Sequence, residues 1–136
     1  MLQRLLYVYE YRIVPVDFSG CLHLKSAVTA VADGVLLINP DWVSADAFPH
    51  CEAIEVDKDE PFGANALRVG EDVVYGSQFP LTRERLAQRG IRVSPVDLSE
   101  LAKAEGAVTC CSLIFEAESP VFGFTRDYST PARPSF

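Results

Sequence analysis

Three short segments, "YRIVPVD" (11–17), "CEAIEVD" (51–57) and "IRVSPVD" (91–97), each end on a Val-Asp pair, and these pairs recur every 40 residues. The tripeptide "AVT" follows the first and the third segment, at 27–29 and 107–109. A period of this length is typical of proteins built from copies of one supersecondary unit. The chain is therefore expected to contain a repeated unit of about 40 residues.

Each unit is expected to combine strands with a helix. Alternating apolar residues predict one strand that ends at the Val-Asp pair and a second strand after a loop, at 24–31, 64–70 and 107–115. Two units add a short third strand and a helical segment: strands at 34–39 and 72–76, and helices at 40–48 and 80–90. The helices argue against a WD40 propeller, whose repeats have a similar length but contain only strands.

The number of units predicts the architecture. The 136 residues hold about two and a half units, whereas repeat folds need roughly three or more to bury a continuous core. We therefore expect residues 1–115 to form one domain of mixed α/β repeats that is part of a larger closed ring. Residues 116–136 carry Pro, Ser, Thr and aromatic residues without periodicity, so they are expected to form a C-terminal extension outside this domain.

Composition excludes several classes of function. A formal net charge of −7 argues against nucleic-acid binding, which favours a basic surface. No segment is long and apolar enough to span a membrane, and the first residues, "MLQRLLYVYEYR", lack the small-residue cleavage site of a signal peptide. Four cysteines without an export signal predict reduced thiols and a cytoplasmic location. No Cys–His cluster has the spacing of a zinc site, so no metal or other cofactor is expected.

The adjacent cysteines Cys110 and Cys111 are the candidate nucleophiles. On a strand over 107–115 their side chains would point to opposite faces, so only one of them could serve a site while the other packs. A catalytic thiol needs a nearby proton acceptor, and His23 precedes the strand that matches the one carrying Cys110. His50 is expected at the surface. Because free cysteines are often simply buried, a structural role for both thiols stays open at this point.

Two further segments are assigned structural roles. The stretch "GANALRVG" (63–70) has a glycine at each end, but it does not match a phosphate-binding loop, and Asn65 is expected to accept an unusual backbone conformation at a turn. The stretch "DKDEP" (57–61) is expected to be a solvated acidic loop.

Four motifs together resemble one enzyme family. "GCLHLKSAVT" and "KAEGAVTCCSLIF" resemble the histidine and cysteine signatures of the dimethylarginine dimethylaminohydrolases, members of the guanidine-modifying superfamily. "EPFGANALRV" and "VDLSELAKAEG" also resemble this family, and the motifs occur in the same order over about residues 9–115. The resemblance implies that residues 1–115 form a partial α/β propeller, the C-terminal part of a five-unit (pentein) fold. It also implies hydrolysis of the guanidinium C–N bond of a methylated arginine, which yields citrulline and an amine.

The resemblance also implies roles for individual residues. Cys110 matches the nucleophile that forms a covalent thiouronium intermediate, and Cys111 is left as a packing residue. His23 matches the general acid–base, and Ser26 lies near the site without a definite role. Ala104 matches the position whose backbone carbonyl holds the substrate α-amino group. An arginine-like small molecule is thus the expected substrate.

The chain departs from the family pattern at its start. The carboxylates that grip the guanidinium, the acid that partners the histidine and an arginine for the substrate carboxylate all precede the histidine motif in the family. Only 22 residues precede His23, and none matches them. We expect the chain to correspond to the C-terminal half of such an enzyme, incomplete alone, with a complementary N-terminal half or a second copy as partner. Arginine deimination, amidino transfer or a catalytically inactive module are the alternatives.

Overall fold

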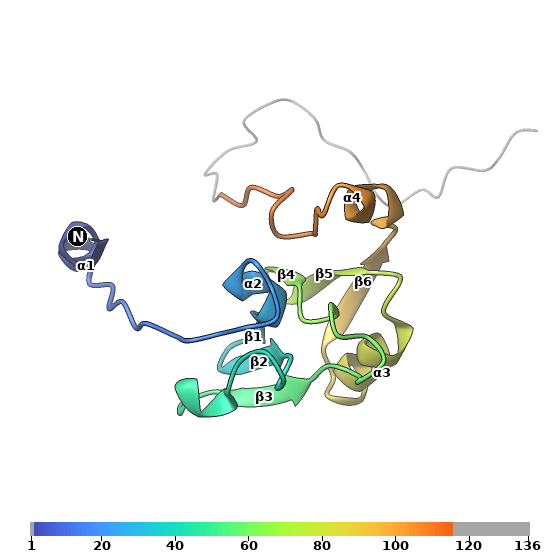
Figure 1. Cartoon of the computed structure of the whole chain (residues 1–136), viewed down its shortest axis with the longest axis horizontal. Coiled ribbons are helices and arrows are strands. Elements are labelled where there is room, and N and C mark those ends of the chain that lie inside the picture. Colours follow the sequence, from blue (N-terminus) through green and yellow to red (C-terminus); the bar gives the residue numbers. More distant parts are fainter. Residues whose placement is uncertain (1, 116–136) are drawn as a thin grey trace, which may run out of the picture.

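The computed structural model describes residues 2–115, which form two three-stranded sheets with short helices around them (Figure 1). The first sheet has the order β1-β2-β3 and the second β4-β5-β6. The six strands are β1 (Val28–Ala32), β2 (Val35–Ile38), β3 (Glu52–Glu55), β4 (Ala66–Val69), β5 (Asp72–Gly76) and β6 (Arg92–Val96). The α/β class is therefore confirmed, while the predicted extension over 116–136 lies outside the described residues.

The two sheets share one topology. In each sheet the first two strands pair antiparallel and the third strand joins parallel to the second. A tight turn closes each antiparallel hairpin, with Gly34 (φ 67°) in the first and Gly70 (φ 61°) in the second. Such turns need residues with positive φ, which glycine adopts without strain. The predicted period is thus expressed as two copies of the same strand arrangement.

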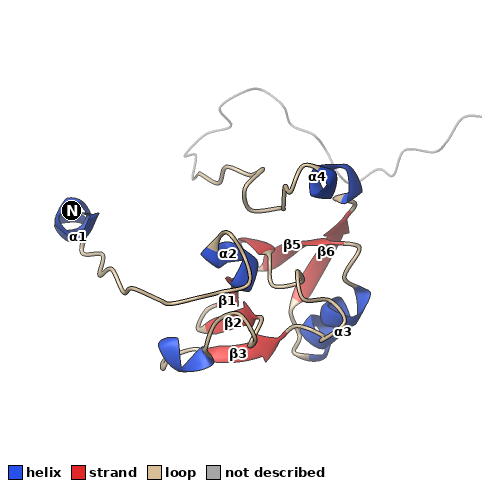
Figure 2. Cartoon of the chain, in the orientation of Figure 1, coloured by secondary structure: helices blue, strands red, loops and turns tan. Residues whose placement is uncertain are grey.

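The helical part of the two units differs. The helix predicted at 80–90 is confirmed as α3 (Pro80–Gln88), which packs beside β6 and β3 (Figure 2). The helix predicted at 40–48 is wrong, because this segment contains only the short 3₁₀ turn η2 (Ala45–Ala47). Two interactions divert the backbone there: the Asp41 amide donates to the Asn39 side chain, and Val43 forms an isolated bridge with Phe18.

The strands predicted at the two ends of the repeat are also wrong. Residues 11–17 have no regular structure and lead to α1 (Leu2–Leu6) and η1 (Tyr7–Tyr9), which lie apart from the sheets (Figure 1). The segment 107–115 forms a turn followed by irregular chain. The strand predicted at 24–31 is confirmed from Val28 onward as β1, but its first half forms the short helix α2 (Leu24–Ala27). The terminal segments lack a neighbouring strand to pair with, so apolar alternation alone did not produce strands there.

The core lies between the two sheets and α3. Leu37, Val73, Tyr75 and Leu86 are fully buried there, and burial raises the pKa of the Tyr75 phenol. The acidic loop predicted at 57–61 is wrong in one respect, because Glu60 is buried rather than solvated. Its carboxylate accepts hydrogen bonds from the first-turn amides of α3, Leu81 N at 2.9 Å and Thr82 N at 2.7 Å. A negative charge at a helix start is favoured by the exposed amide groups.

The hydroxyl group of Thr29 links the two sheets. Thr29 of β1 donates from Oγ1 to the Ala64 carbonyl at 2.6 Å, and the same atom accepts from the Ala66 amide of β4 at 3.1 Å. The edge strands β1 and β4 therefore lie against each other and hold the units in a fixed relation. Among the described residues, no helix is long and apolar enough to cross a membrane.

Candidate active site

The loop before α2 places His23. Gly20 (φ 74°) sits so close to the Trp42 indole that a Cβ atom would collide with it, and the Ser19 amide donates to the Trp42 carbonyl at 2.9 Å. The Cys21 thiol donates to the His23 carbonyl at 3.3 Å, and burial raises the pKa of that thiol. His23 directly precedes α2, and its side chain is exposed. The backbone of this loop is thus anchored while the imidazole stays accessible.

The end of α4 (Ser99–Lys103) directs the chain toward Cys110. The Gly106 amide donates to the Leu101 carbonyl at 2.8 Å and the Glu105 amide to the Ala102 carbonyl at 3.0 Å. These two bonds form a Schellman motif, and Glu105 occupies its left-handed position with φ 56°. The motif reverses the chain, so the residues after it form a turn instead of the predicted strand.

Cys110 is exposed at this turn. Its Sγ atom lies 3.0 Å from the Ala107 amide nitrogen, which donates to it. This backbone hydrogen bond favours the charged form and lowers the pKa of the Cys110 thiol. A thiolate is the reactive form of cysteine, so the turn supports nucleophilic chemistry at this sulfur.

Cys111 does not lie on an opposite, buried face, as the strand prediction required. It is exposed, and its Sγ atom lies 3.9 Å from that of Cys110. The packing role predicted for Cys111 is therefore wrong, because adjacent side chains diverge on a strand but converge on this turn. The hydrogen bond with the Cys110 sulfur raises the pKa of Cys111.

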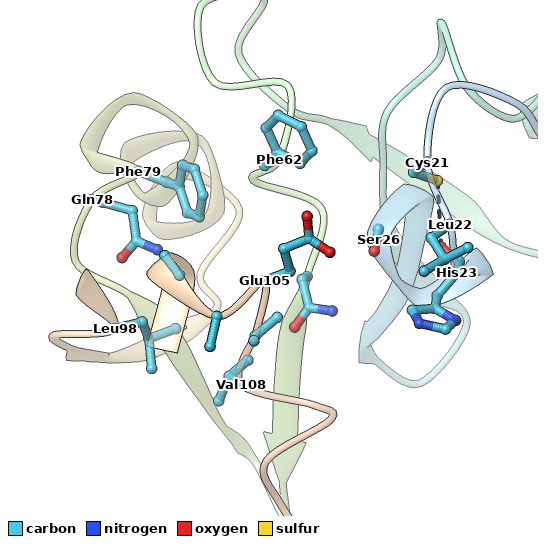
Figure 3. A pocket seen from close by; sticks show the side chains of 15 residues that line it. Cys21, Leu22, His23, Ser26, Phe62, Gln78, Phe79, Leu98, Glu105 and Val108 are labelled. Atoms are coloured by element: carbon cyan, nitrogen blue, oxygen red, sulfur yellow. Dashed lines mark hydrogen bonds between the residues drawn. The ribbon is translucent and has the colours of Figure 1, made fainter. Parts of the chain in front are cut away.

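A pocket of about 740 Å³ lies between the loop before α2 and the segment after α4. It brings His23 and Ala104 together on its wall, and Figure 3 shows the side chains around it. Within residues 2–115, no donor bonds the Ala104 carbonyl, which leaves it free to accept a ligand. Cys110 is not among the lining residues, although Val108, two positions earlier, is one of them.

Asn65 connects the two sides of this pocket. Its Nδ2 atom donates to the Lys25 carbonyl of α2 and to Thr109 Oγ1, both at 2.9 Å, and its Oδ1 atom accepts from the Thr109 amide at 3.2 Å. The backbone role predicted for Asn65 is wrong, because its φ is not positive and its side chain makes the contacts. No local sequence pattern identified this link, because it joins residues 40 and 44 positions apart.

Glu105 is a second residue that the sequence did not single out. Among the described residues, it is the one carboxylate that lines the pocket, and Figure 3 shows it between the group around Phe79 and the group around His23. Its left-handed backbone sets the direction of the side chain. A carboxylate in this position can attract a cationic ligand. Within residues 2–115, no group of three or more His, Cys, Asp or Glu side chains could hold a metal ion.

The fold of the chain is similar to that of a known amidinotransferase. No protein-family profile matches the chain. The structure superposes on SxtG, an amidinotransferase from Microseira wollei in the saxitoxin biosynthetic pathway, with a TM-score of 0.76 over 88% of this chain and 38% of that one. The sequences are only 19% identical, so this likeness concerns the fold alone. The chain thus has the α/β fold found in amidinotransferases.

Sequence similarity narrows this class. The N(G),N(G)-dimethylarginine dimethylaminohydrolase of Pseudomonas aeruginosa is 38% identical over 94 residues, which are 69% of this chain and 37% of that protein. The enzyme of the same name from Streptomyces coelicolor is 36% identical over 104 residues, or 75% of this chain and 39% of that protein. A structure of the Pseudomonas enzyme superposes with a TM-score of 0.61 over 67% of this chain and 36% of that one, at 35% identity.

The chain is related to the dimethylarginine dimethylaminohydrolases, and the resemblance predicted from its motifs is confirmed. It spans a little over a third of the length of the curated relatives that it matches.

Proposed function

We propose that the chain supplies the nucleophile and the acid–base of a hydrolase that cleaves the guanidinium C–N bond of a dimethylated arginine, releasing citrulline and dimethylamine. Cys110 is the proposed nucleophile and His23 the proposed acid–base. Because the chain spans only part of its relatives, a complementary segment must supply the rest of the site.

The spacing of the two residues carries this proposal. The superposed Pseudomonas structure is a cysteine-to-serine mutant complexed with citrulline, and a second dimethylarginine dimethylaminohydrolase structure is a histidine-to-glycine adduct with S-methyl-L-thiocitrulline. The separation in sequence number between those two substituted positions equals that between His23 and Cys110. The equal spacing supports a matching pair of roles in this chain.

The chemistry requires both residues in turn. The Cys110 thiolate attacks the guanidinium carbon, and as the bond from that carbon to the methylated nitrogen breaks, His23 gives its proton to the departing amine. This leaves a thiouronium bound to Cys110. Water then loses one proton to His23 and attacks the same carbon. As the C–S bond breaks and the thiolate is restored, the added hydroxyl group loses its remaining proton to the released amine or to solvent, and citrulline leaves. A resonance-stabilised guanidinium needs a strong nucleophile, and the Ala107 amide that stabilises the Cys110 thiolate supports this role.

Substrate orientation is the proposed role of the pocket wall. The Ala104 carbonyl is proposed to accept from the substrate α-amino group, and its place on the wall opposite the His23 loop supports this. Asn65 is a positioning residue, because it ties α2 to the residue that precedes Cys110. We therefore expect these Asn65 hydrogen bonds to keep the His23 side and the Cys110 side of the site in a fixed relation.

The groups that would hold the guanidinium are proposed to come from outside residues 1–136. We propose that the two sheets are units of a five-unit α/β propeller, whose remaining units come from a complementary N-terminal half or a second copy. The clamp for the guanidinium would come from that segment. The chain alone is then incomplete in catalysis. The prediction of a cytoplasmic location stays a prediction that rests on cysteine usage.

The test uses an electrophile together with the natural substrate. A dimethylarginine dimethylaminohydrolase forms an adduct with 4-chloro-2-hydroxymethylpyridine, so the chain is incubated with this compound and the modified residue is located by peptide mass spectrometry. Label is expected on Cys110, absent in Cys110→Ala and retained in Cys111→Ser. Label on Cys51 with none on Cys110 would contradict the assignment.

A citrulline assay tests completeness. With dimethylarginine, the chain alone is expected to form little citrulline, and robust turnover would overturn the proposal of an incomplete site. Light scattering reports whether the chain pairs with itself, and a stable monomer would count against an open ring that exposes unpaired strand edges. On a complemented protein, a panel of arginine, dimethylarginine and an amine acceptor separates hydrolysis of dimethylarginine from deimination and amidino transfer.

A further inference from the structure

Cys110 and Cys111 present two neighbouring thiols to solvent. The sulfur atoms are 3.9 Å apart, and both side chains are exposed. Gly106 leaves room for this arrangement, because a Cβ atom there would lie 3.4 Å from Cys111 Sγ and 3.0 Å from the Leu101 carbonyl. The proposed catalytic role uses only Cys110. The second thiol is therefore accessible, close to the nucleophile and without an assigned task.

The two thiols differ in character. Cys110 Sγ accepts from the Ala107 amide, which lowers the pKa of this thiol, whereas the neighbouring sulfur raises the pKa of Cys111. Cys110 is therefore the more easily ionised thiol of the pair. Sensor cysteines in proteins combine an accessible thiolate with a second thiol that resolves its oxidised form.

We propose that Cys110 and Cys111 form a hydroperoxide-sensitive pair, in which Cys111 converts an oxidised Cys110 into a reversible disulfide between adjacent residues. The Cys110 thiolate attacks one oxygen of the hydroperoxide, the O–O bond breaks, and the departing oxygen leaves as water or an alcohol after it takes a proton. Cys110 becomes a sulfenic acid. The Cys111 sulfur then attacks the Cys110 sulfur, the S–O bond breaks, and the oxygen leaves as water with the Cys111 proton. Cys110 and Cys111 are oxidised by two electrons in total, and the hydroperoxide is reduced by two.

The covalent geometry makes such a bond easy to reverse. Adjacent Cα atoms lie only about 3.8 Å apart across a trans peptide bond, whereas disulfides usually join Cα atoms roughly 4.4–6.8 Å apart. A bond outside this range is strained and more readily reduced by a thiol. The disulfide would occupy the nucleophile while protecting it from irreversible oxidation. Only this consequence for activity rests on the proposed function, since the thiol chemistry does not require a substrate.

The experiment compares three forms of the whole chain: the wild type, Cys111→Ser and Cys51→Ser. Each form is treated with an equimolar amount of hydrogen peroxide in the presence of dimedone, which traps sulfenic acids, and is then digested and analysed by mass spectrometry. Cys51 is exposed and free, so its substitution is the matched control. Circular dichroism spectra confirm that the forms share one fold.

The wild type and Cys51→Ser are expected to give a peptide with a Cys110–Cys111 disulfide that dithiothreitol reverses. In Cys111→Ser the dimedone adduct on Cys110 is expected to rise by about an order of magnitude. Equal dimedone labelling of Cys110 in the wild type and in Cys111→Ser would overturn the proposal. Oxidation of Cys51 with no change at Cys110 would overturn it as well. If the pyridine compound labels Cys110 but no disulfide forms, the redox proposal fails while the proposed function stands. If the disulfide forms but the pyridine compound does not label Cys110, the proposed function fails while the redox proposal stands.

Discussion

Leu37 and Val73, at the centres of the two sheets, are fully buried, whereas His23 and Cys110, on the loops beside the pocket, are exposed. We call residues 18–23 and 104–111 the rim segments. Apolar packing and strand pairing stabilise the sheets. The rim segments depend instead on a few backbone hydrogen bonds, on the close contact of Gly20 with Trp42 and on the left-handed backbone conformation of Glu105. Stability and reactivity therefore depend on separate groups of residues in this chain. Asn65 connects the two groups through its side-chain hydrogen bonds.

The largest expected effect is at Leu86, on the sheet side of this comparison. Leu86→Ala removes a fully buried side chain from the core under α3 and is expected to lower the free energy of unfolding by about 2–5 kcal/mol. Urea denaturation measures this change. The matched control is Leu81→Ala on the same helix, where the side chain is 45% exposed, and a change of less than about 0.5 kcal/mol is expected. Equal losses at the two positions would contradict the location of the core.

An intermediate effect is expected at Asn65, which joins the sheets to the rim segments. Asn65→Ala removes the bonds to Lys25 and Thr109 and is expected to cost about 1–3 kcal/mol. Hydrogen exchange of the Thr109 amide is expected to become faster. Asn39→Ala is the matched control: it removes another buried asparagine that bonds backbone groups, at Pro61 and Asp41, but leaves the Thr109 amide protected. Faster exchange in both variants would show that Asn65 has no special role as a link.

The smallest effect is expected within a rim segment. Glu105→Gly relieves a left-handed backbone conformation that a side chain disfavours, and it is expected to stabilise the chain by up to about 1 kcal/mol. Ala102→Gly, placed in the preceding helix, is the matched control and is expected to destabilise by about 0.5–1 kcal/mol. Thermal unfolding followed by circular dichroism distinguishes the two signs. A loss of stability in Glu105→Gly would mean that the Glu105 side chain stabilises the fold by more than its left-handed backbone conformation destabilises it.

The sequence predicts the sheets better than the rim segments, for a physical reason. The strands at 72–76 and 91–97 and the helix at 80–90 were predictable because apolar periodicity reports burial, and burial determines these elements. The segment 107–115 has the same apolar alternation, yet a Schellman motif and a turn override it. Glu105 in a left-handed position gives no compositional signal, because glycine is the residue that usually marks such a site.

The candidate site was predictable as a pair of motifs but not as a geometry. His23 and Cys110 came from motif resemblance, whereas the contact between the two cysteine sulfurs depends on a turn that local patterns do not specify. The link through Asn65 was not predicted, because its partners Lys25 and Thr109 are 40 and 44 positions away in the sequence. Side-chain hydrogen bonds between distant segments depend on how the units pack, so they emerge only with the tertiary structure.

The two copies of "AVT" have an evolutionary consequence. Thr29 bonds the backbone on either side of Asn65, and Thr109 bonds the Asn65 side chain, so the hydroxyls of both copies act on the same short stretch of the middle unit. Valine has nearly the shape of threonine but cannot form these bonds. During divergence of the repeat, serine is therefore expected to be tolerated at both positions, whereas valine is expected to be selected against, even at Thr29, where it would suit the buried strand.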